Sequence, residues 1–299
     1  MLRRLHGIAA AIEHGQPVVA LETSVLAQGL PIPHNATAAE AMDRAVREAG
    51  ALPALTAVAG GVPTLGLTSA ELARFLARDG VRKIGARDIA PCAVAGADGA
   101  TTVAAALALA HAGGVRVFAT GGIGGVHRGA PYDESGDLLA LARTPLVVTC
   151  AGAKSILDLP ATLERLETLN VAVVGWGTDE LPGFFTRTTG LRIAHVVDGA
   201  EAVARMARTQ WSLGLPGAIL VVIPPPAATA LAQAEVDAAV GRALVEAERA
   251  GVRGAALTPF LLGAVVAATG GRSLAANLAL LEQNARVAGE IAVALGHLA

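Results

Sequence analysis

Lysine is rare in this sequence, and the setting of one lysine suggests chemistry. The chain has 23 lysine and arginine residues, of which only Lys83 and Lys154 are lysine. Arginine cannot lose its proton in a protein, whereas a desolvated lysine can, and the neutral amine can attack a carbonyl carbon to form a Schiff base. Lys154 follows the apolar run Leu146–Cys150 after three small residues. We therefore interpret Lys154 as a candidate imine-forming residue; the alternative is that both lysines survived by chance.

A carboxyl group stands at the end of another apolar run. Glu22 directly follows Pro17–Leu21 and precedes Thr23 and Ser24. A carboxyl group in this position can serve as a general acid or base. The alternative is structural, because a glutamate can also cap the next turn through a backbone N–H. The local sequence does not decide between the two roles.

The glycine-rich segment "TGGIGGVHRG", Thr120–Gly129, follows a third apolar run. Its glycines leave backbone N–H groups open to a phosphate or another polar ligand, and His127 and Arg128 add polar side chains. The glycine spacing is not that of the dinucleotide-binding motif, and glycine-rich turns often serve only tight packing. The segment is a candidate ligand loop because its glycines and its two polar side chains occur together.

Asp133, Ser135 and Asp137 alternate just before a predicted helix. Oxygen ligands at this spacing suit a hard divalent ion such as Mg²⁺ or Mn²⁺, or a phosphate ester held by the serine and the helix N-terminus. A simpler account is that Ser135 caps the helix and that the acids around it are solvated. On the spacing alone, capping is favoured.

Short apolar strands joined by helices must position these residues. Apolar runs predict strands near residues 17–21, 54–60, 115–120, 146–150, 171–175 and 218–223. Helical periodicity predicts helices over residues 35–49, 69–78, 101–111, 161–169, 201–213 and 233–250. Continuous apolar strands that alternate with helices indicate an α/β fold, with a mainly parallel central sheet in a three-layer α/β/α arrangement. Ligands bind beyond the carboxyl ends of such strands, where Glu22, the glycine-rich segment and Lys154 all lie.

Composition limits the classes of protein to which this chain can belong. No linker, repeat or low-complexity tract divides the chain, so we predict a single domain, residues 1–299. A formal net charge of -2 with 16% charged residues leaves no basic face for nucleic acid. Cys92 and Cys150 lie in apolar contexts without a CxxC or histidine companion, which is typical of buried reduced thiols in a cytoplasmic protein. The uncharged run Gly254–Gly271 contains proline and glycine, so we expect a buried helix rather than a membrane span.

Several long motifs resemble those of one known family. In chain order they are "VALETSVLAQGLPIPHN", "FATGGIGGVHRGA", "CAGAKSILDLPAT", "ELPGFFTRT" and "TPFLLGAVVAATGGRSLAANLALLEQNA". Together they resemble the pseudouridine-5'-phosphate glycosidase family, which includes the indigoidine synthase A-like proteins. The resemblance implies reversible cleavage of the C–C glycosidic bond of pseudouridine 5'-phosphate to uracil and ribose 5-phosphate. It also implies a homotrimer that depends on Mn²⁺ or another divalent cation such as Mg²⁺.

The resemblance assigns roles to particular residues. Lys154 would be the Schiff-base lysine, Glu22 the acid/base residue and Asp133 the metal-binding residue. The substrate-binding positions would be Lys83, Val103, Thr120, His127, Ser135, Gly136, Asp137 and Asn277.

The implied chemistry accounts for these residue types. A C-glycosidic bond has no heteroatom leaving group to protonate, so hydrolysis by paired carboxylates is a poor route. Opening the ribose ring and holding C1' as an imine of Lys154 supplies an electron sink, and Glu22 moves protons to the ring oxygen and the uracil carbon. Two alternatives remain: a Schiff-base lyase acting on another sugar phosphate or C-nucleotide, and a catalytically silent nucleotide-binding module. The presence of both lysines and Glu22 favours an enzyme.

Overall fold

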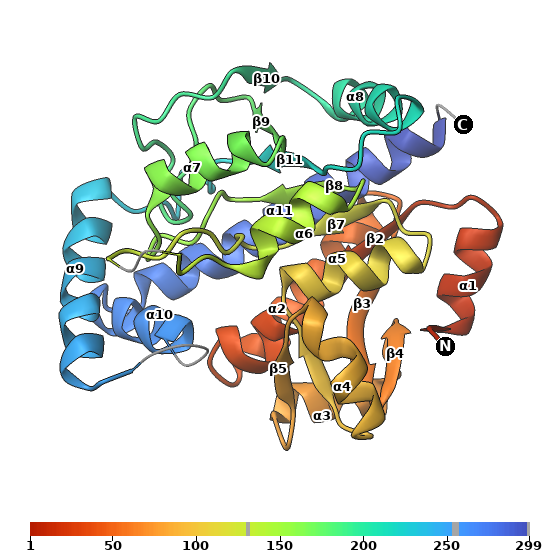
Figure 1. Ribbon diagram of the computed structural model, residues 1–299, viewed down its shortest axis with the longest axis horizontal. Coiled ribbons are helices and arrows are strands. Elements are labelled where there is room, and N and C mark those ends of the chain that lie inside the picture. The colour runs from red at the N-terminus through yellow and green to blue at the C-terminus, as the bar shows by residue number, and fades with distance from the viewer. Residues whose placement is uncertain (130–131, 253–256, 298–299) are drawn as a thin grey trace.

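A mainly parallel sheet lies at the centre of the computed structural model, which describes residues 1–129, 132–252 and 257–297 (Figure 1). Within these residues the strand order is β1-β4-β3-β2-β7-β8-β11-β9-β10, with β6 paired to β3 and β5 paired to β6. The strands are β1 (Arg3–Arg4), β2 (Val18–Leu21), β3 (Leu52–Ala59), β4 (Val62–Leu65), β5 (Arg82–Ile84), β6 (Gly99–Thr101), β7 (Val117–Ala119), β8 (Val147–Cys150), β9 (Ala172–Trp176), β10 (His195–Val197) and β11 (Ile219–Val222).

Helices cover both faces of this sheet. One layer contains α5, α6 and α7, and the other contains α2, α8 and the long α11, which passes behind β7 and β8 in Figure 1. The helices are α1 (His6–Glu13), α2 (His34–Glu48), α3 (Ser69–Ala77), α4 (Ile89–Val94), α5 (Val103–Ala112), α6 (Gly136–Arg143), α7 (Leu159–Thr168), α8 (Ala200–Ser212), α9 (Gln233–Arg249), α10 (Leu257–Ala268) and α11 (Arg272–His297), with short turns η1 (Val25–Gly29) and η2 (Ala86–Asp88). The predicted three-layer α/β fold is confirmed.

The apolar runs became the parallel core strands. Every residue of β2, β7, β8 and β11 is buried, because helices cover both faces and no position along these strands meets water. The core strands pair in parallel, β2 with β7, β7 with β8 and β8 with β11. Their carboxyl ends therefore meet at one edge of the sheet.

The short strands in the other part of the sheet were not predicted. The first half of β3 pairs in parallel with β2, whereas its second half pairs antiparallel with both β4 and β6. The strands β1, β4, β5 and β6 are two to four residues long, and β1 and β5 contain arginine or lysine, so none of them has an apolar run. This part of the sheet carries Lys83.

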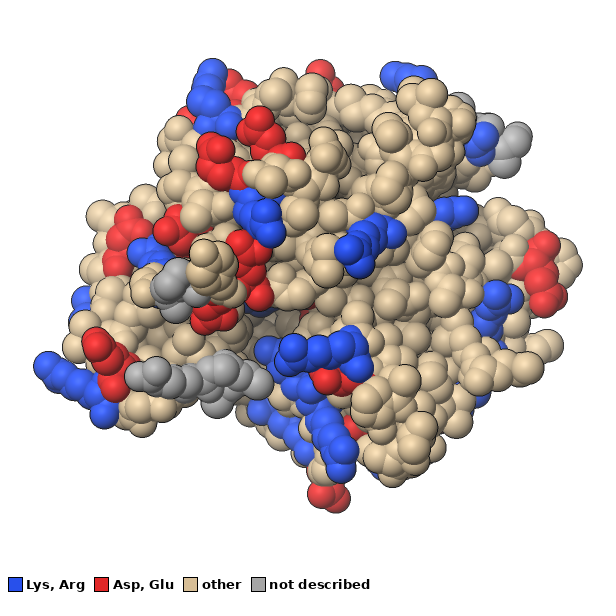
Figure 2. Space-filling view, in the orientation of Figure 1, with Lys and Arg blue, Asp and Glu red and all other residues tan. Residues whose placement is uncertain are grey.

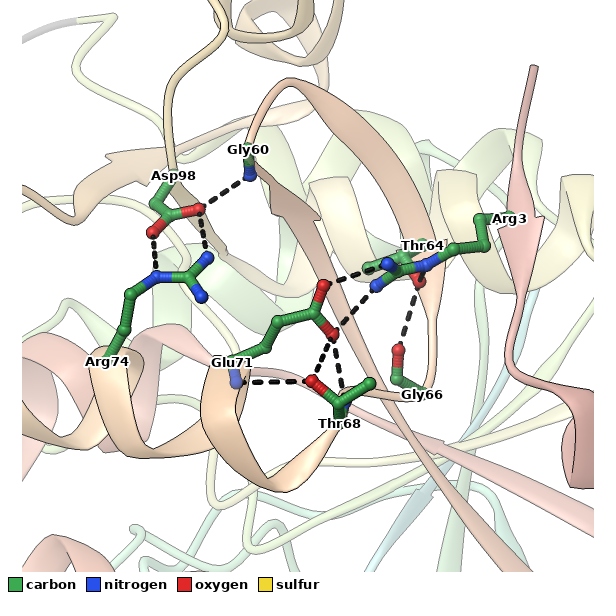
Figure 3. Close-up of polar contacts among 8 residues, drawn as sticks. All are labelled: Arg3, Gly60, Thr64, Gly66, Thr68, Glu71, Arg74 and Asp98. Carbon is green, nitrogen blue, oxygen red and sulfur yellow. Dashed lines mark hydrogen bonds and ion pairs between the residues drawn. The ribbon is translucent and has the colours of Figure 1, made fainter.

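Side-chain ion pairs stabilise this second part (Figure 3). Thr68 and Glu71 form the reciprocal capping box at the start of α3, as their spacing predicts. Glu71 also pairs with Arg3 of β1 at 2.8 Å. Arg74 donates two hydrogen bonds to Asp98, which precedes β6. These contacts join the N-terminal strand, α3 and the β6 segment.

The C-terminal helices agree only in part with expectation. The helical prediction is confirmed, and the chain breaks at Gly270–Gly271 between α10 and α11. However, Leu261 and Val265 are the buried residues of α10, so this helix is buried along one side and not throughout. Residues 254–256 of the uncharged run lie outside the described residues. Among the described helices, none is by itself long and apolar enough to cross a membrane, although α10 and α11 together meet that test with a bend of 118° between them.

Both cysteines are buried and unpaired, as predicted. Burial raises the pKa of the Cys150 thiol to about 12, so this residue stays protonated and unreactive at neutral pH.

Candidate active site

Glu22 lies at the carboxyl end of β2, where it is buried. The Ser24 hydroxyl donates a hydrogen bond to Oε2 at 2.5 Å, and the Thr120 hydroxyl donates to Oε1. Among the described residues its hydrogen-bond donors are thus side-chain hydroxyls, and no backbone N–H is among them. The geometry favours the acid/base interpretation over capping.

Three threonines hold the segment around Glu22 in place. Thr23 follows β2, Thr56 lies on β3 and Thr101 ends β6, and all three are fully buried. Thr23 and Thr101 both donate to the carbonyl of Thr56 at 2.8 Å, and the backbone N–H of Thr101 donates to the Thr23 hydroxyl at 3.0 Å. This threonine cluster joins the parallel core to the part of the sheet that carries Lys83.

Lys154 follows β8 and points toward the glycine-rich segment. Its Nζ donates a hydrogen bond to the carbonyl oxygen of Gly122 at 2.7 Å. Gly152 has a positive φ of 87°, and a Cβ there would collide with the carbonyl of Pro182, so only glycine fits this turn. The backbone N–H of Ile123 donates to the Gly152 carbonyl at 3.1 Å, which keeps the segments after β7 and β8 side by side.

Lys83 faces the same group of charges from β5. Loss of hydration on burial, and then the positive charge of Lys154, lower the pKa of Lys83, whereas Glu22 and Asp137 act in the opposite direction. By its surface area, however, Lys83 is an exposed residue, so water weakens this effect. These four side chains therefore share one electrostatic environment, although they come from β5 and from the segments that follow β2, β7 and β8.

Ser135 caps α6, and Asp137 makes a second kind of contact. The Ser135 hydroxyl accepts the backbone N–H of Asp137, so the capping role is confirmed. The expectation that the surrounding acids are solvated is wrong for Asp137, which is only 5% exposed. Its two oxygens accept backbone N–H groups of Ala104 at 2.9 Å and Gly124 at 2.8 Å. A buried carboxylate needs such donors, and these bring the start of α5, where Val103 lies, against the glycine-rich segment. Gly136 is the exposed first residue of α6.

Asp133 lies farther out, beside His127. The side chain of Asp133 is 51% exposed, and its Oδ1 is 3.1 Å from His127 Nδ1. Within the described part of the chain, no group of three or more His, Cys, Asp or Glu side chains is arranged around a common metal position. The alternating acids therefore do not form one ligand set, because Asp137 is committed to backbone donors. A half-exposed carboxylate fits a divalent ion that keeps most of its water ligands.

Two asparagines of α11 complete the site from behind the sheet. Asn277 is buried, and its Oδ1 has no hydrogen-bond partner among the described residues. It lies beside Gly121, since a Cβ at Gly121 would be 3.5 Å from that oxygen. Asn284 is fully buried and donates to the carbonyl of Thr120 at 2.9 Å. Sequence reasoning missed Asn284, although a polar residue on an apolar helix face, seven residues after Asn277, was a usable signal.

The predicted residues thus converge on one edge of the sheet. Figure 2 shows a hollow on this face, with basic side chains gathered at the border formed by β5 and η2 and acidic side chains on the opposite border. Two cavities of about 320 and 660 Å³ lie elsewhere, one between α2 and α11 and one at the amino ends of β2 and β7. Neither contains any of the predicted site residues, so we locate the site from the convergence of reactive side chains.

Comparison with known proteins identifies the family of the chain. A model of the family described as indigoidine synthase A like protein matches residues 7–294. The chain is 61% identical to the pseudouridine-5'-phosphate glycosidase of Gemmatimonas aurantiaca, over 95% of this chain and 93% of the relative. It is 52% identical to the enzyme of the same name from Chloroflexus aurantiacus, over the full length of both chains.

Solved structures show the same fold. The prealnumycin C-glycosynthase in complex with ribulose 5-phosphate matches with a TM-score of 0.92 and 39% identity, over 100% of this chain and 98% of that one. An indigoidine synthase A-like protein from Thermotoga maritima matches with a TM-score of 0.90 and 37% identity, over 99% and 97% of the two chains.

Proposed function

The chain belongs to the indigoidine synthase A-like family, and we propose that it is a pseudouridine-5'-phosphate glycosidase. It cleaves the C–C glycosidic bond of pseudouridine 5'-phosphate reversibly, giving uracil and ribose 5-phosphate. The relatives of that name match the chain over nearly its whole length. The structural relative that binds ribulose 5-phosphate supports a five-carbon sugar phosphate as the ligand.

One observation carries the proposal: Glu22 and Lys154 bind the same three-residue segment, Thr120–Gly122. Glu22 accepts the Thr120 hydroxyl, and the Lys154 ammonium donates to the Gly122 carbonyl. A carboxyl group and an amine are thus held on two sides of one turn. An acid/base residue next to an imine-forming lysine is the pair that this cleavage needs.

The proposed mechanism uses that pair in sequence. Glu22 delivers a proton to the ribose ring oxygen, and the neutral amine of Lys154 bonds to C1' of the opened sugar. The nitrogen of Lys154 then forms a C=N bond to C1' as the C1'–C5 bond breaks, and the electrons of the broken bond stay on C5 of uracil, which takes up a proton. Water then hydrolyses the imine and releases ribose 5-phosphate and free Lys154.

The phosphate and sugar are held from the opposite side of the site. Lys83 supplies a positive charge, and Val103 lies at the first turn of α5, where backbone N–H groups favour an anion. The other proposed substrate contacts are Thr120, His127, Ser135, Gly136, Asp137 and Asn277. Binding energy gained at the phosphate orients C1' near Lys154.

We also propose that Asp133 holds Mn²⁺ or another divalent cation such as Mg²⁺, largely through water. When bound, the ion supplies positive charge near the substrate. The exposed carboxylate of Asp133 supports this assignment. The homotrimer and the cytoplasmic location stay predictions.

The test combines turnover with chemical trapping. Uracil release from pseudouridine 5'-phosphate is followed by absorbance, and borohydride is added with ribose 5-phosphate to reduce any imine. We expect turnover, and a covalent adduct on the peptide that contains Lys154. Lys154→Arg keeps the charge but cannot become a neutral amine, so it should be inactive and untrappable.

Two outcomes contradict parts of the proposal. Absence of uracil release by the folded protein refutes the substrate, and trapping with another sugar phosphate alone then favours a different Schiff-base lyase. Turnover without any reducible adduct refutes the imine and leaves a route through Glu22 alone. An adduct on Lys83 would mean that Lys83 forms the imine and that Lys154 supplies the positive charge.

A further inference from the structure

The segment Thr120–Gly122 holds both reactive side chains, and α11 in turn holds this segment. Asn284 of α11 has no exposed surface. Its Nδ2 donates to the carbonyl of Thr120 at 2.9 Å and to that of Gly121 at 3.3 Å. A buried carbonyl without a donor is costly, so these bonds fix the turn strongly.

A second link closes the arrangement. The hydroxyl of Thr149, on β8, donates to the backbone carbonyl of Asn284 at 2.9 Å. The backbone N–H of Thr120 donates to the carbonyl of Thr149 at 3.0 Å. Thr120, Thr149 and Asn284 therefore form a closed ring of hydrogen bonds that joins the end of β7, β8 and α11, and each of the three is buried.

Side-chain packing adds to these bonds. A Cβ at Gly121 would be 3.2 Å from Leu281 and 3.3 Å from Leu280, which are both on α11. The helix thus lies directly against the backbone of the turn. The position of α11 consequently sets where the Thr120 hydroxyl and the Gly122 carbonyl lie.

We propose that Asn284 is a positioning residue for both Glu22 and Lys154. It acts through the turn: the Thr120 hydroxyl orients the Glu22 carboxylate, and the Gly122 carbonyl orients the Lys154 amine. This proposal rests on the proposed function. It makes Asn284 a determinant of the rate of imine formation and cleavage, and not of phosphate binding, because Lys83 and α5 belong to the other side of the site.

Asn35 offers a matched control. It is also a buried asparagine, 1% exposed, whose Nδ2 donates to two carbonyls, those of Leu26 at 3.1 Å and Leu76 at 2.9 Å. These bonds join η1 to α3 and touch neither Thr120–Gly122 nor Lys154, although η1 follows Ser24, which donates to Glu22. Replacing either asparagine by leucine removes the same donor group at similar volume. Asn35 also accepts the backbone N–H of Ala36, so Asn35→Leu should lose at least as much stability as Asn284→Leu.

The experiment compares Asn284→Leu with Asn35→Leu and the parent, each assayed well below its thermal midpoint. Asn284→Leu should lower kcat about 10- to 100-fold, the cost of misplacing reacting groups by about 1 Å, with KM within about threefold. Borohydride trapping at Lys154 with ribose 5-phosphate should slow in parallel. Asn35→Leu should show a lowered midpoint with kcat and trapping rate within about threefold of the parent, because Glu22 keeps its bond to Thr120 and Lys154 keeps its bond to Gly122.

A double-mutant cycle identifies the route. Thr120→Val removes the hydroxyl that reaches Glu22, so combining it with Asn284→Leu should lose less rate than the product of the two single losses. Equal kcat and trapping rates in Asn284→Leu and the parent would overturn the proposal. So would equal rate losses in the two asparagine variants. Trapping needs Lys154 and a sugar phosphate but no C–C glycosidic bond, so it still tests Asn284 if the proposed substrate is wrong.

Discussion

Glu71→Gln should destabilise the protein in a pH-dependent way. In the folded chain Glu71 accepts hydrogen bonds from Arg3 and from Thr68 at the start of α3 (Figure 3). Glutamine can still accept the backbone N–H in the capping box, so the substitution removes mainly the charge. The neighbouring Arg3, and to a smaller extent Thr68, hold the pKa of Glu71 at about 2, compared with its ordinary 4.5.

The size of the effect follows from this pKa. The difference between 4.5 and about 2, at about 1.36 kcal/mol for each pH unit, corresponds to about 3.4 kcal/mol as an upper limit. The Arg3 side chain is 34% exposed, so water screens the pair, and we expect about 1–2 kcal/mol. The folded-state pKa is the lower one. The stabilisation is therefore complete above pH 4.5 and is lost as the pH falls toward 2, with about two fifths left at pH 3.

Urea unfolding of the parent and Glu71→Gln at pH 7, 5 and 3 measures this difference. Both proteins share every other carboxyl group, so the difference in their unfolding free energies isolates Glu71. Glu201→Gln is the control, because Glu201 also lies in the first turn of a helix but is 86% exposed in its pair with Arg205. That variant should stay within about 0.5 kcal/mol of the parent. A Glu71→Gln difference of the same size at pH 7 and pH 3 would refute the reasoning.

Three further predictions concern the site. Glu22→Gln should fold normally and lose about 10²–10⁴ in kcat, and an unstable variant that is fully active per folded molecule would contradict the acid/base role. Burial and the Lys154 charge lower the pKa of Lys83, so the KM of the parent should rise as the pH increases through that lowered pKa. Lys83→Arg stays charged, so its KM should be higher than that of the parent but should not depend on pH. The same rise of KM in both proteins would exclude Lys83 as the cause. Chelation of the metal should abolish turnover, and added Mn²⁺ should restore turnover in the parent. Calorimetry should show that Mn²⁺ binds the parent but binds Asp133→Ala poorly. Full activity of the metal-free protein would contradict the assignment of Asp133 as the metal-binding residue.

The parallel core could be predicted well because a strand that is buried on both faces needs a continuous apolar run, which is visible in the sequence. Each of the six predicted strands is present within about two residues of its expected position. The strands β5 and β6 have no such apolar run. They are three residues long. β6 is a strand because it pairs with the second half of β3, and β5 is a strand because it pairs with β6, so the cause is tertiary.

The same physical distinction separates the site residues that could be predicted from the contacts that could not. Glu22 and Lys154 could be predicted because Glu22 directly follows an apolar run and Lys154 follows one after three small residues, and parallel strands bring such positions to one edge. The contacts of Asp137 and Asn284 could not, because their partners are backbone groups 33 and 164 residues away. The sequence can mark Asn284 as an unusual polar residue on an apolar helix face, but it cannot show which distant backbone groups that side chain binds.

The position of α11 at the end of the described chain affects how the enzyme acquires activity during synthesis. Glu22 and Lys154 are both synthesised before α11, whose first residue, Arg272, lies 118 residues after Lys154. At about 5–20 residues per second, roughly 6–24 s of translation separate Lys154 from the first turn of α11. Throughout that interval the amine exists in the nascent chain without the helix that orients its turn. On the proposed mechanism, Lys154 therefore reaches its productive geometry toward a sugar phosphate only once α11 has been made and has packed beneath the sheet.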